Sequence, residues 1–150
     1  MKWLSSKEVK RILKQLKEEY EAEPLLDYQF LINHEDKVYI INNEIKNINF
    51  SILRTNTIGL YIGRLVKNEL KLSIEGSQLI GPYAKKNTIE LDDKLIQEWI
   101  RGFNIDLEGS HKGFVIIKNK NDYFGCGKHK ENKILNMVPK ERRIVSLRKV

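Results

Sequence analysis

The residue types that could do chemistry gather near the C-terminus, in residues 123–144, YFGCGKHKENKILNMVPKERRI. This stretch holds the chain's one cysteine, Cys126, with His129 and a dense run of lysines and arginines. A thiol becomes a nucleophile when a neighbouring cation or base lowers its pKa. In an extended strand Lys128 would share a face with Cys126, which could place a cation beside the sulfur. Two hypotheses follow: a small cysteine-dependent enzyme, or a basic surface for an acidic partner.

The surroundings of Cys126 favour packing over catalysis. The sequence has no G-x-S-x-G or comparable turn that would expose a nucleophile. Cys126 lies between two glycines in a strand-like run, where a thiol packs as a small apolar group. We therefore predict no catalytic residue.

Metal and phosphate motifs are also incomplete. Zinc sites need clustered ligands, and His34, His111, His129 and Cys126 lack the C-x₂-C or H-x₃₋₅-H spacing. The string GCGK is only a fragment of a phosphate-binding loop, because neither G-x-x-x-x-G-K-[ST] nor G-x-G-x-x-G is complete. Its glycines favour a bulge or a tight bend, and would also let a polynucleotide backbone approach. We expect no metal and no cofactor.

The charge of the chain is concentrated at its C-terminal end. The net charge is +7, and from position 128 onward eight lysines and arginines face only Glu131 and Glu141, a net +6. A second basic string, Lys85-Lys86-Asn87, follows the sequence GPYA. Clustered cations on a nearly neutral body indicate an acidic polymer as partner, or else a solvated tail. Tyr83 and Tyr123 would add stacking surfaces for bases, unless they lie in the core.

Length and composition indicate a folded, soluble protein. The chain has 150 residues, 41% of them apolar and 31% charged, enough for one domain or two small ones. No apolar run approaches the roughly 18 residues of a membrane span, and the N-terminus lacks the apolar core of a signal peptide. A single cysteine forms no internal disulfide and favours a cytoplasmic location. We expect a cytoplasmic protein with no membrane contact.

Residues 1–72 are predicted to form an α+β unit. Ser5 and Glu8 make an S-x-x-E capping box before a helix whose apolar positions recur at helical spacing, and Pro24 ends any continuation. YQFLINHEDKVYIIN and TIGLYIGRLVKNELKLS are typical of two β-hairpins, the second turning at Lys67-Asn68. The string between them, NEIKNINFSILRT, fits a helix or a strand equally well. One helix on a small antiparallel sheet follows from this pattern.

Residues 73–150 are predicted to form a small β-barrel with one helix. Two glycines and a proline in SIEGSQLIGPY interrupt the pattern and indicate a domain boundary near Ser73. Asp92 caps the helix, and Gly102 stands where a left-handed residue ends one. The strings GFVIIKN, YFGCGK and KILNMVP are typical of strands. The expected fold class is α+β throughout.

These strings together carry a family resemblance. LSIEGSQLIGPYAKKNTIEL, DDKLIQEWIRGFNI and GFVIIKNKNDYFGCGKHKENKILNMVPKERRI resemble a PUA domain over roughly residues 73–145. The resemblance is to the module found as a stand-alone archaeal protein and at the C-terminus of some Sun-type (nucleolar-protein-related) rRNA cytosine methyltransferases. IGLYIGRL extends a weaker resemblance into the N-terminal part. The resemblance implies a pseudo-barrel that binds structured RNA.

The resemblance also implies where RNA would bind. It places the RNA-facing residues around the glycine loop and the adjacent strands, and the rest of the basic segment extends that surface. The full predicted set is Gly76, Ser77, Lys85, Lys86, Asn87, Lys128, His129, Lys130, Lys133, Lys140, Arg142 and Arg143.

Catalysis is not part of what the resemblance implies here. The related methyltransferases carry a cofactor-binding domain and a catalytic cysteine upstream, for which this chain has neither the length nor the glycine-rich motif. We expect a non-catalytic RNA-binding protein in rRNA or tRNA maturation and ribosome biogenesis. A separate RNA-modifying enzyme or ribosome-assembly factor is a further expected partner. The alternatives are a protein-interaction subunit of such a complex and, last, the cysteine-dependent enzyme.

Overall fold

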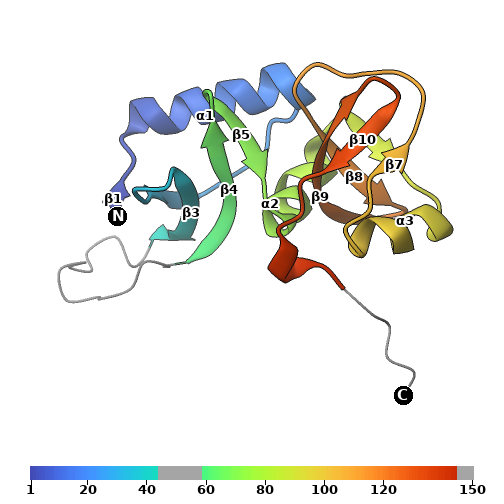
Figure 1. Ribbon diagram of the computed structural model, residues 1–150. Helices are drawn as coiled ribbons and strands as arrows, with labels where there is room; N and C mark the ends of the chain where they lie inside the picture. The colour runs from blue at the N-terminus through green and yellow to red at the C-terminus, as the bar shows by residue number, and fades with distance from the viewer. Residues whose placement is uncertain (44–58, 145–150) are drawn as a thin grey trace.

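The N-terminal part is a helix on an antiparallel sheet, as predicted. The computed structural model describes residues 1–43 and 59–144, so most of NEIKNINFSILRT lies outside the described residues. Helix α1 (Ser6–Tyr20) lies along one face of a five-stranded sheet of order β1-β2-β3-β4-β5 (Figure 1). The strands are β1 (Lys2–Trp3), β2 (Tyr28–Ile32), β3 (Lys37–Asn42), β4 (Leu60–Val66) and β5 (Glu69–Leu72).

Both ends of α1 are set by local sequence. The Ser5 hydroxyl accepts the Glu8 N–H at 3.2 Å, and the Glu8 carboxylate accepts the Ser5 N–H at 3.1 Å, which completes the predicted capping box. The helix ends at Glu21, whose left-handed backbone (φ 50°) closes the last turn before Pro24. Its inward stripe, Ile12, Leu16 and Tyr20, is buried against the sheet.

The C-terminal part is a curled, mostly antiparallel half-barrel with helix α3 (Asp93–Ile100), which confirms the fold class. The strand order is β6-β8-β9-β10-β7, and β6 pairs with β8 in parallel, which the sequence did not indicate. Asp92 caps α3 by accepting the Leu95 N–H at 2.8 Å, and buried Trp99 donates from Nε1 to the Phe124 carbonyl at 2.8 Å. The strands are β6 (Thr88–Glu90), β7 (Ile105–Asp106), β8 (Phe114–Asn119), β9 (Asp122–Lys130) and β10 (Lys133–Asn136).

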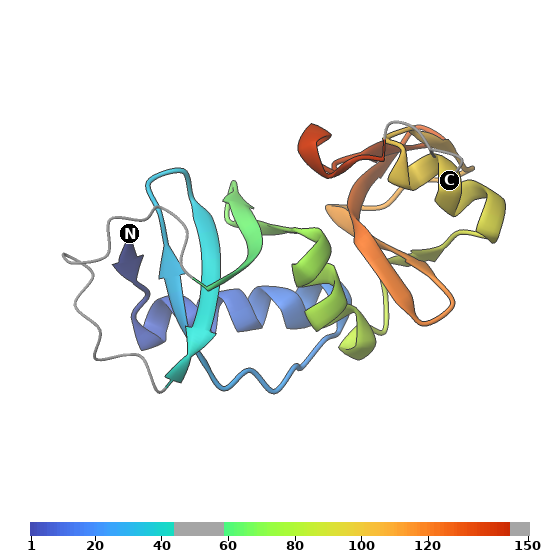
Figure 2. The ribbon, with the colours of Figure 1, turned by 90° about the horizontal axis from the view of Figure 1, so that it is seen from below.

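A second helix occupies the segment where glycines and proline predicted a break. Helix α2 (Ile74–Ile80) runs into the 3-10 turn η2 (Gly81–Tyr83) and contacts strands of both sheets, so it lies between them (Figure 2). Ser73 caps α2 by accepting the Gly76 N–H at 2.9 Å. A glycine is needed at position 76 because a Cβ there would lie 1.9 Å from the Ile62 carbonyl oxygen of β4. The division of the chain into residues 1–72 and 73–150 stays a prediction.

The last turn of α1 joins the two parts through hydrogen bonds. The backbone N–H groups of Lys85 and Lys86 donate to the Tyr20 carbonyl at 2.8 and 3.2 Å. The Asn87 side-chain amide donates to the Glu19 carbonyl, and the Phe114 N–H donates to Glu19 Oε1 at 3.1 Å. One buried cluster also spans both parts, since it contains residues of α1, of the first sheet, of α2 and of β8. In the described part of the chain, no helix has the length and apolar character to span a membrane.

The junction carboxylate of Glu19 gives a pH prediction. Burial raises the pKa of Glu19 from an ordinary 4.5 to about 7; the Phe114 N–H opposes this and the charge of Glu69 adds to it. Because the folded-state pKa is the higher one, stability from the protonated form is complete below about pH 4.5 and is lost as the pH rises through about 7. Glu19→Gln keeps an acceptor for Phe114 and cannot ionise. We expect it to raise the melting temperature at pH 8 and to change it little at pH 5, and equal shifts at both pH values would contradict this assignment.

Candidate nucleic-acid interface

Cys126 is a packing residue, as the sequence indicated. Its side chain is 2% exposed, and the thiol donates to the Leu72 carbonyl at 3.2 Å. Burial raises the pKa of Cys126 to about 12, so the thiolate that a nucleophile needs is scarce at neutral pH. Residues 125, 127 and 129 face the other side of β9, and Gly127 packs closely on Trp99 and Leu135.

Cys126→Ser is expected to leave RNA affinity unchanged and to lower the free energy of unfolding by about 1 kcal/mol. The hydroxyl can donate to the same Leu72 carbonyl, but it is costlier to bury than a thiol. Urea denaturation and RNA titration of the variant would measure the two effects. If the variant has a native circular dichroism spectrum but binds RNA much more weakly, Cys126 takes part in binding and is not only a packing residue.

Gly76, Ser77 and His129 do not reach the surface, which corrects their prediction as RNA contacts. All three are buried. The Ser77 hydroxyl donates to the Ile74 carbonyl at 2.6 Å and accepts the Gly125 N–H at 2.8 Å, so it ties α2 to β9. The glycine and the serine were assigned to a loop, whereas they lie on the inner side of a helix between two sheets.

His129 is held inside the half-barrel by two partners. Its Nε2 lies 2.8 Å from the Leu107 carbonyl and its Nδ1 lies 2.7 Å from Nδ1 of His111. If neutral His129 donates from Nε2, then it accepts at Nδ1, and His111 is the donor. Burial, and then the charge of His129, lower the pKa of His111. The strand period predicts this inward position, since residue 129 shares a face with Gly125 and Gly127. Across residues 1–43 and 59–144, no three His, Cys, Asp or Glu side chains gather as metal ligands.

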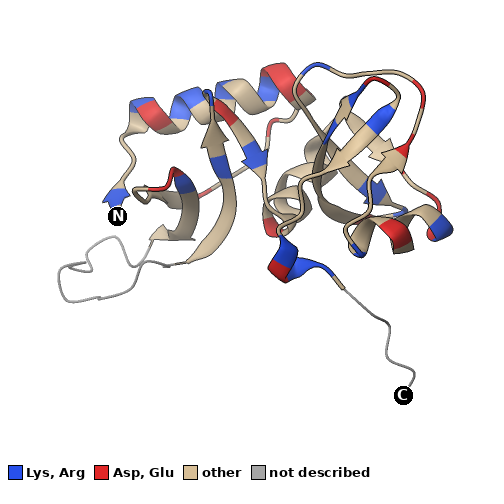
Figure 3. Ribbon diagram, viewed as in Figure 1, with Lys and Arg blue, Asp and Glu red and all other residues tan. Residues whose placement is uncertain are grey.

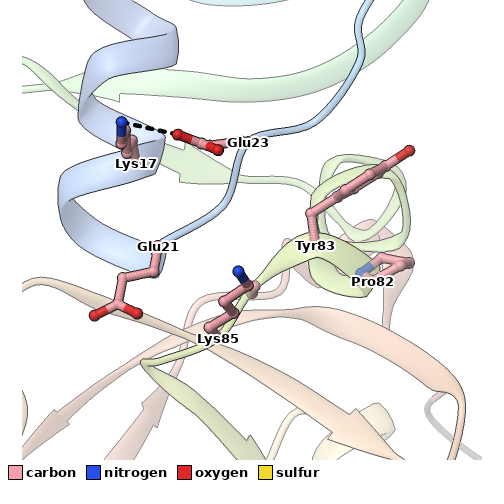
Figure 4. Close-up of a pocket in the computed structure, with 7 residues that line it drawn as sticks. Lys17, Glu21, Glu23, Pro82, Tyr83 and Lys85 are labelled. Atoms are coloured by element: carbon pink, nitrogen blue, oxygen red, sulfur yellow. Dashed lines mark ion pairs between the residues drawn. The ribbon is translucent and has the colours of Figure 1, made fainter.

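The basic string after η2 provides exposed cations beside a shallow cleft. Asn87 has a left-handed backbone (φ 56°) and uses its amide at the junction, but the Lys85 and Lys86 side chains are exposed. A cleft of about 570 Å³ lies between the end of α1 and η2 (Figure 4). It is lined by Lys17, Glu21, Glu23, Pro82, Tyr83, Ala84 and Lys85.

Charges in this cleft are mixed, and one aromatic ring is open to solvent. Lys17 and Glu23 form an ion pair on the α1 side of the cleft, with Nζ 2.8 Å from Oε1 (Figure 4). Tyr83 is 41% exposed, which leaves it available for stacking. Tyr123, by contrast, packs on Gly81, where an added Cβ would lie 2.3 Å from its ring. Of the two tyrosines, only Tyr83 therefore presents an open surface.

The remaining predicted cations lie on β9, on β10 and beyond. Lys128 is exposed, with Nζ 5.7 Å from the centre of the buried Phe114 ring. Lys130 and Lys133 flank the turn between β9 and β10. Lys133 forms an ion pair with Asp106, with Nζ 3.9 Å from Oδ1. The 3-10 turn η3 (Lys140–Arg142) follows the opposite end of β10. Figure 3 shows Lys and Arg positions, in blue, on several strands and at η3.

Two of the three cations around η3 are engaged within the protein. Arg142 Nη2 lies 2.6 Å from Glu75 Oε1 and links η3 to α2. Burial raises the pKa of Glu75, but the hydrogen bond from Arg142, a backbone hydrogen bond and the charge of Arg142 together outweigh burial and hold the pKa below its ordinary value. Arg143 donates from Nε to the Val138 carbonyl at 3.0 Å. Lys140 is exposed.

The fold, a capped helix on an antiparallel sheet followed by a half-barrel with one helix, is consistent with a PUA-like fold, and two family models match its two parts. Residues 1–74 match the pre-PUA domain of NIP7/UPF0113, and residues 86–144 match the PUA domain of the methyltransferase RsmF. The C-terminal part of the chain is thus homologous to the PUA module of this Sun-family rRNA methyltransferase.

Two relatives show how far the similarity extends. The ribosomal RNA small subunit methyltransferase F of Vibrio cholerae serotype O1 (strain M66-2) is 30% identical over 90 residues, which is 59% of this chain and 19% of the relative. The protein of that name from Vibrio vulnificus (strain YJ016) is 28% identical over 89 residues, with the same shares. The chain thus spans about a fifth of the length of these curated relatives. An archaeal source stays a prediction.

Proposed function

We propose that this chain binds structured RNA without catalysing a reaction itself, and that it acts in rRNA maturation or ribosome biogenesis. We place rRNA before tRNA as the bound RNA, because the named relatives are small-subunit rRNA methyltransferases. The exposed lysines of the half-barrel and of the string after η2 would neutralise RNA phosphates. A cytoplasmic location stays a prediction from the single cysteine.

The observation that carries the proposal is that the basic segment is folded. Six of its eight cations, from Lys128 to Arg143, lie on strands β9 and β10 or in and beside η3. The backbone of these six residues is already held in the half-barrel. RNA binding would therefore not have to fix a flexible segment first, which would cost conformational entropy. Their exposed members, with Lys85 and Lys86, form the surface that we assign to RNA.

The proposal is tested by comparing structured RNA with DNA. We expect the full chain to bind an rRNA hairpin more tightly than a DNA duplex of equal length in the same buffer, with affinity falling steeply as salt rises. Fluorescence anisotropy at several salt concentrations measures both quantities. Equal affinity for unrelated DNA would show that binding depends only on positive charge, and it would contradict the proposal of RNA-specific binding.

A protein-interaction role is the second candidate, and the cleft between α1 and η2 favours it. Opposite charges there already neutralise each other, as the Lys17–Glu23 pair shows, which suits a polar protein surface better than phosphates. The partner would be an RNA-modifying enzyme or a ribosome-assembly factor. Such a complex would tolerate salt, whereas phosphate binding would not.

A further inference from the structure

An open aromatic ring lies beyond the predicted RNA-contact residues, just after α3. Phe103 is 53% exposed, and the Arg101 guanidinium carbon lies 5.4 Å from its ring centre. Four cation–ring pairs occur in residues 1–43 and 59–144, and in three of them the ring is buried or half-buried against the protein. Within that part of the chain, only Phe103 combines a neighbouring cation with a ring that faces solvent.

The loop that carries Phe103 is fixed by hydrogen bonds. The Asn136 side-chain amide donates to the Trp99 carbonyl at 2.8 Å and to the Phe103 carbonyl at 3.1 Å. The Asn136 N–H donates to Asn104 Oδ1 at 2.9 Å, and the Phe103 N–H donates to the Glu98 carbonyl at 3.1 Å. Because the backbone is already ordered, a ligand that stacks on this ring has little loop entropy left to overcome.

A second arginine borders the same loop. The Arg143 side chain passes so close to Gly102 that a Cβ at position 102 would lie 2.4 Å from Arg143 Cδ. Gly102 also has φ +96°, which favours glycine. The Ile144 N–H donates to the Ile100 carbonyl at 2.9 Å, which holds the chain after η3 against the end of α3. The Phe103 ring is thus placed on a hydrogen-bonded loop, with the Arg101 guanidinium over the ring and the Arg143 side chain against the neighbouring Gly102.

We propose that Phe103, Arg101 and Arg143 form a stacking platform for an unpaired nucleobase of bound RNA. A flat exposed ring accepts the face of any base, and guanidinium groups stack on bases or pair with the adjacent phosphates. The inference rests on the proposed RNA binding and adds a contact to single-stranded RNA at the end of α3, separate from the cations at Lys85, Lys86 and Lys128.

The test uses one RNA hairpin in two forms, blunt and with short unpaired extensions at both ends. We expect the wild-type chain to bind the extended hairpin more tightly than the blunt one. Phe103→Ala should weaken binding of the extended hairpin by about 5- to 150-fold, which is the contribution of one stacked base. It should weaken binding of the blunt hairpin, whose only unpaired bases lie in the loop, much less. Phe103→Trp should keep the preference and show quenching of tryptophan fluorescence when the extended hairpin binds.

Leu25→Ala provides the matched control, because Leu25 is an exposed apolar residue (88%) in the N-terminal part, after α1. It should bind both hairpins as the wild type does. If Phe103→Ala, with a native circular dichroism spectrum, binds the extended hairpin like the wild type, the platform is overturned while RNA binding stands. If the wild type binds neither hairpin, the proposed function itself fails, and the platform falls with it.

Discussion

Replacing Lys85, Lys86 and Lys128 together by alanine is expected to lower the salt dependence of RNA binding by about two to three units in the log–log slope. Each phosphate contact contributes on the order of 0.9 if the value for B-DNA holds for duplex RNA. All three side chains are exposed, and among the described residues Lys86 is the one of the three with an ion pair, its Nζ lying 4.0 Å from Glu21 Oε1, where it competes with phosphate. Affinity at moderate salt should fall strongly, as measured by anisotropy titrations.

Two comparison variants separate position from charge. Lys7, Lys10 and Lys14 are exposed on the N-terminal helix, so replacing them removes the same charge and should change the slope less. Deleting residues 146–150 removes Arg148 and Lys149, and we expect a smaller loss than for the first triple variant. If the deletion abolishes binding while that triple variant keeps its slope, the binding element is the C-terminal end and not the surface of the half-barrel.

Gly76→Ala is expected to lower the free energy of unfolding by roughly 3 kcal/mol or more, because the new Cβ would overlap the backbone of β4. The clash is with the Ile62 carbonyl oxygen, at 1.9 Å, and with its carbon, at 2.8 Å. Neither atom can rotate away, since both belong to a strand inside a sheet. Urea denaturation monitored by circular dichroism would measure the loss, and RNA binding would disappear only together with the fold.

The control for this variant lies on the same helix. Gln78 is exposed on α2, and Gln78→Ala should change the free energy of unfolding by no more than about 0.5 kcal/mol. A Gly76→Ala protein that kept wild-type stability and lost RNA binding would reverse our conclusion. Gly76 would then be an RNA contact, as the family resemblance had implied.

Sequence alone determined the features that depend on neighbouring residues. The capping box of Ser5 and Glu8 and the cap of Asp92 were predicted because their donors and acceptors lie within four residues. The hairpin turn at Lys67-Asn68 was predicted too, and both residues have positive φ (50° and 66°), as a type I′ turn requires. The packing role of Cys126 followed in the same way from its glycine neighbours in a strand.

Tertiary structure decided which of the predicted RNA contacts are accessible. Ser77 and His129 have polar side chains that local sequence favours at a surface, yet each is also held by a partner more than twenty residues away, Gly125 for Ser77 and Leu107 for His129. The parallel pairing of β6 with β8 and the separation of the C-terminal cations along β10 likewise depend on where strands meet. Composition and spacing report local backbone preference and total charge, whereas burial depends on contacts between distant segments. The exposure of Phe103 beside Arg101, with Arg143 against the neighbouring Gly102, was therefore visible only in the folded chain.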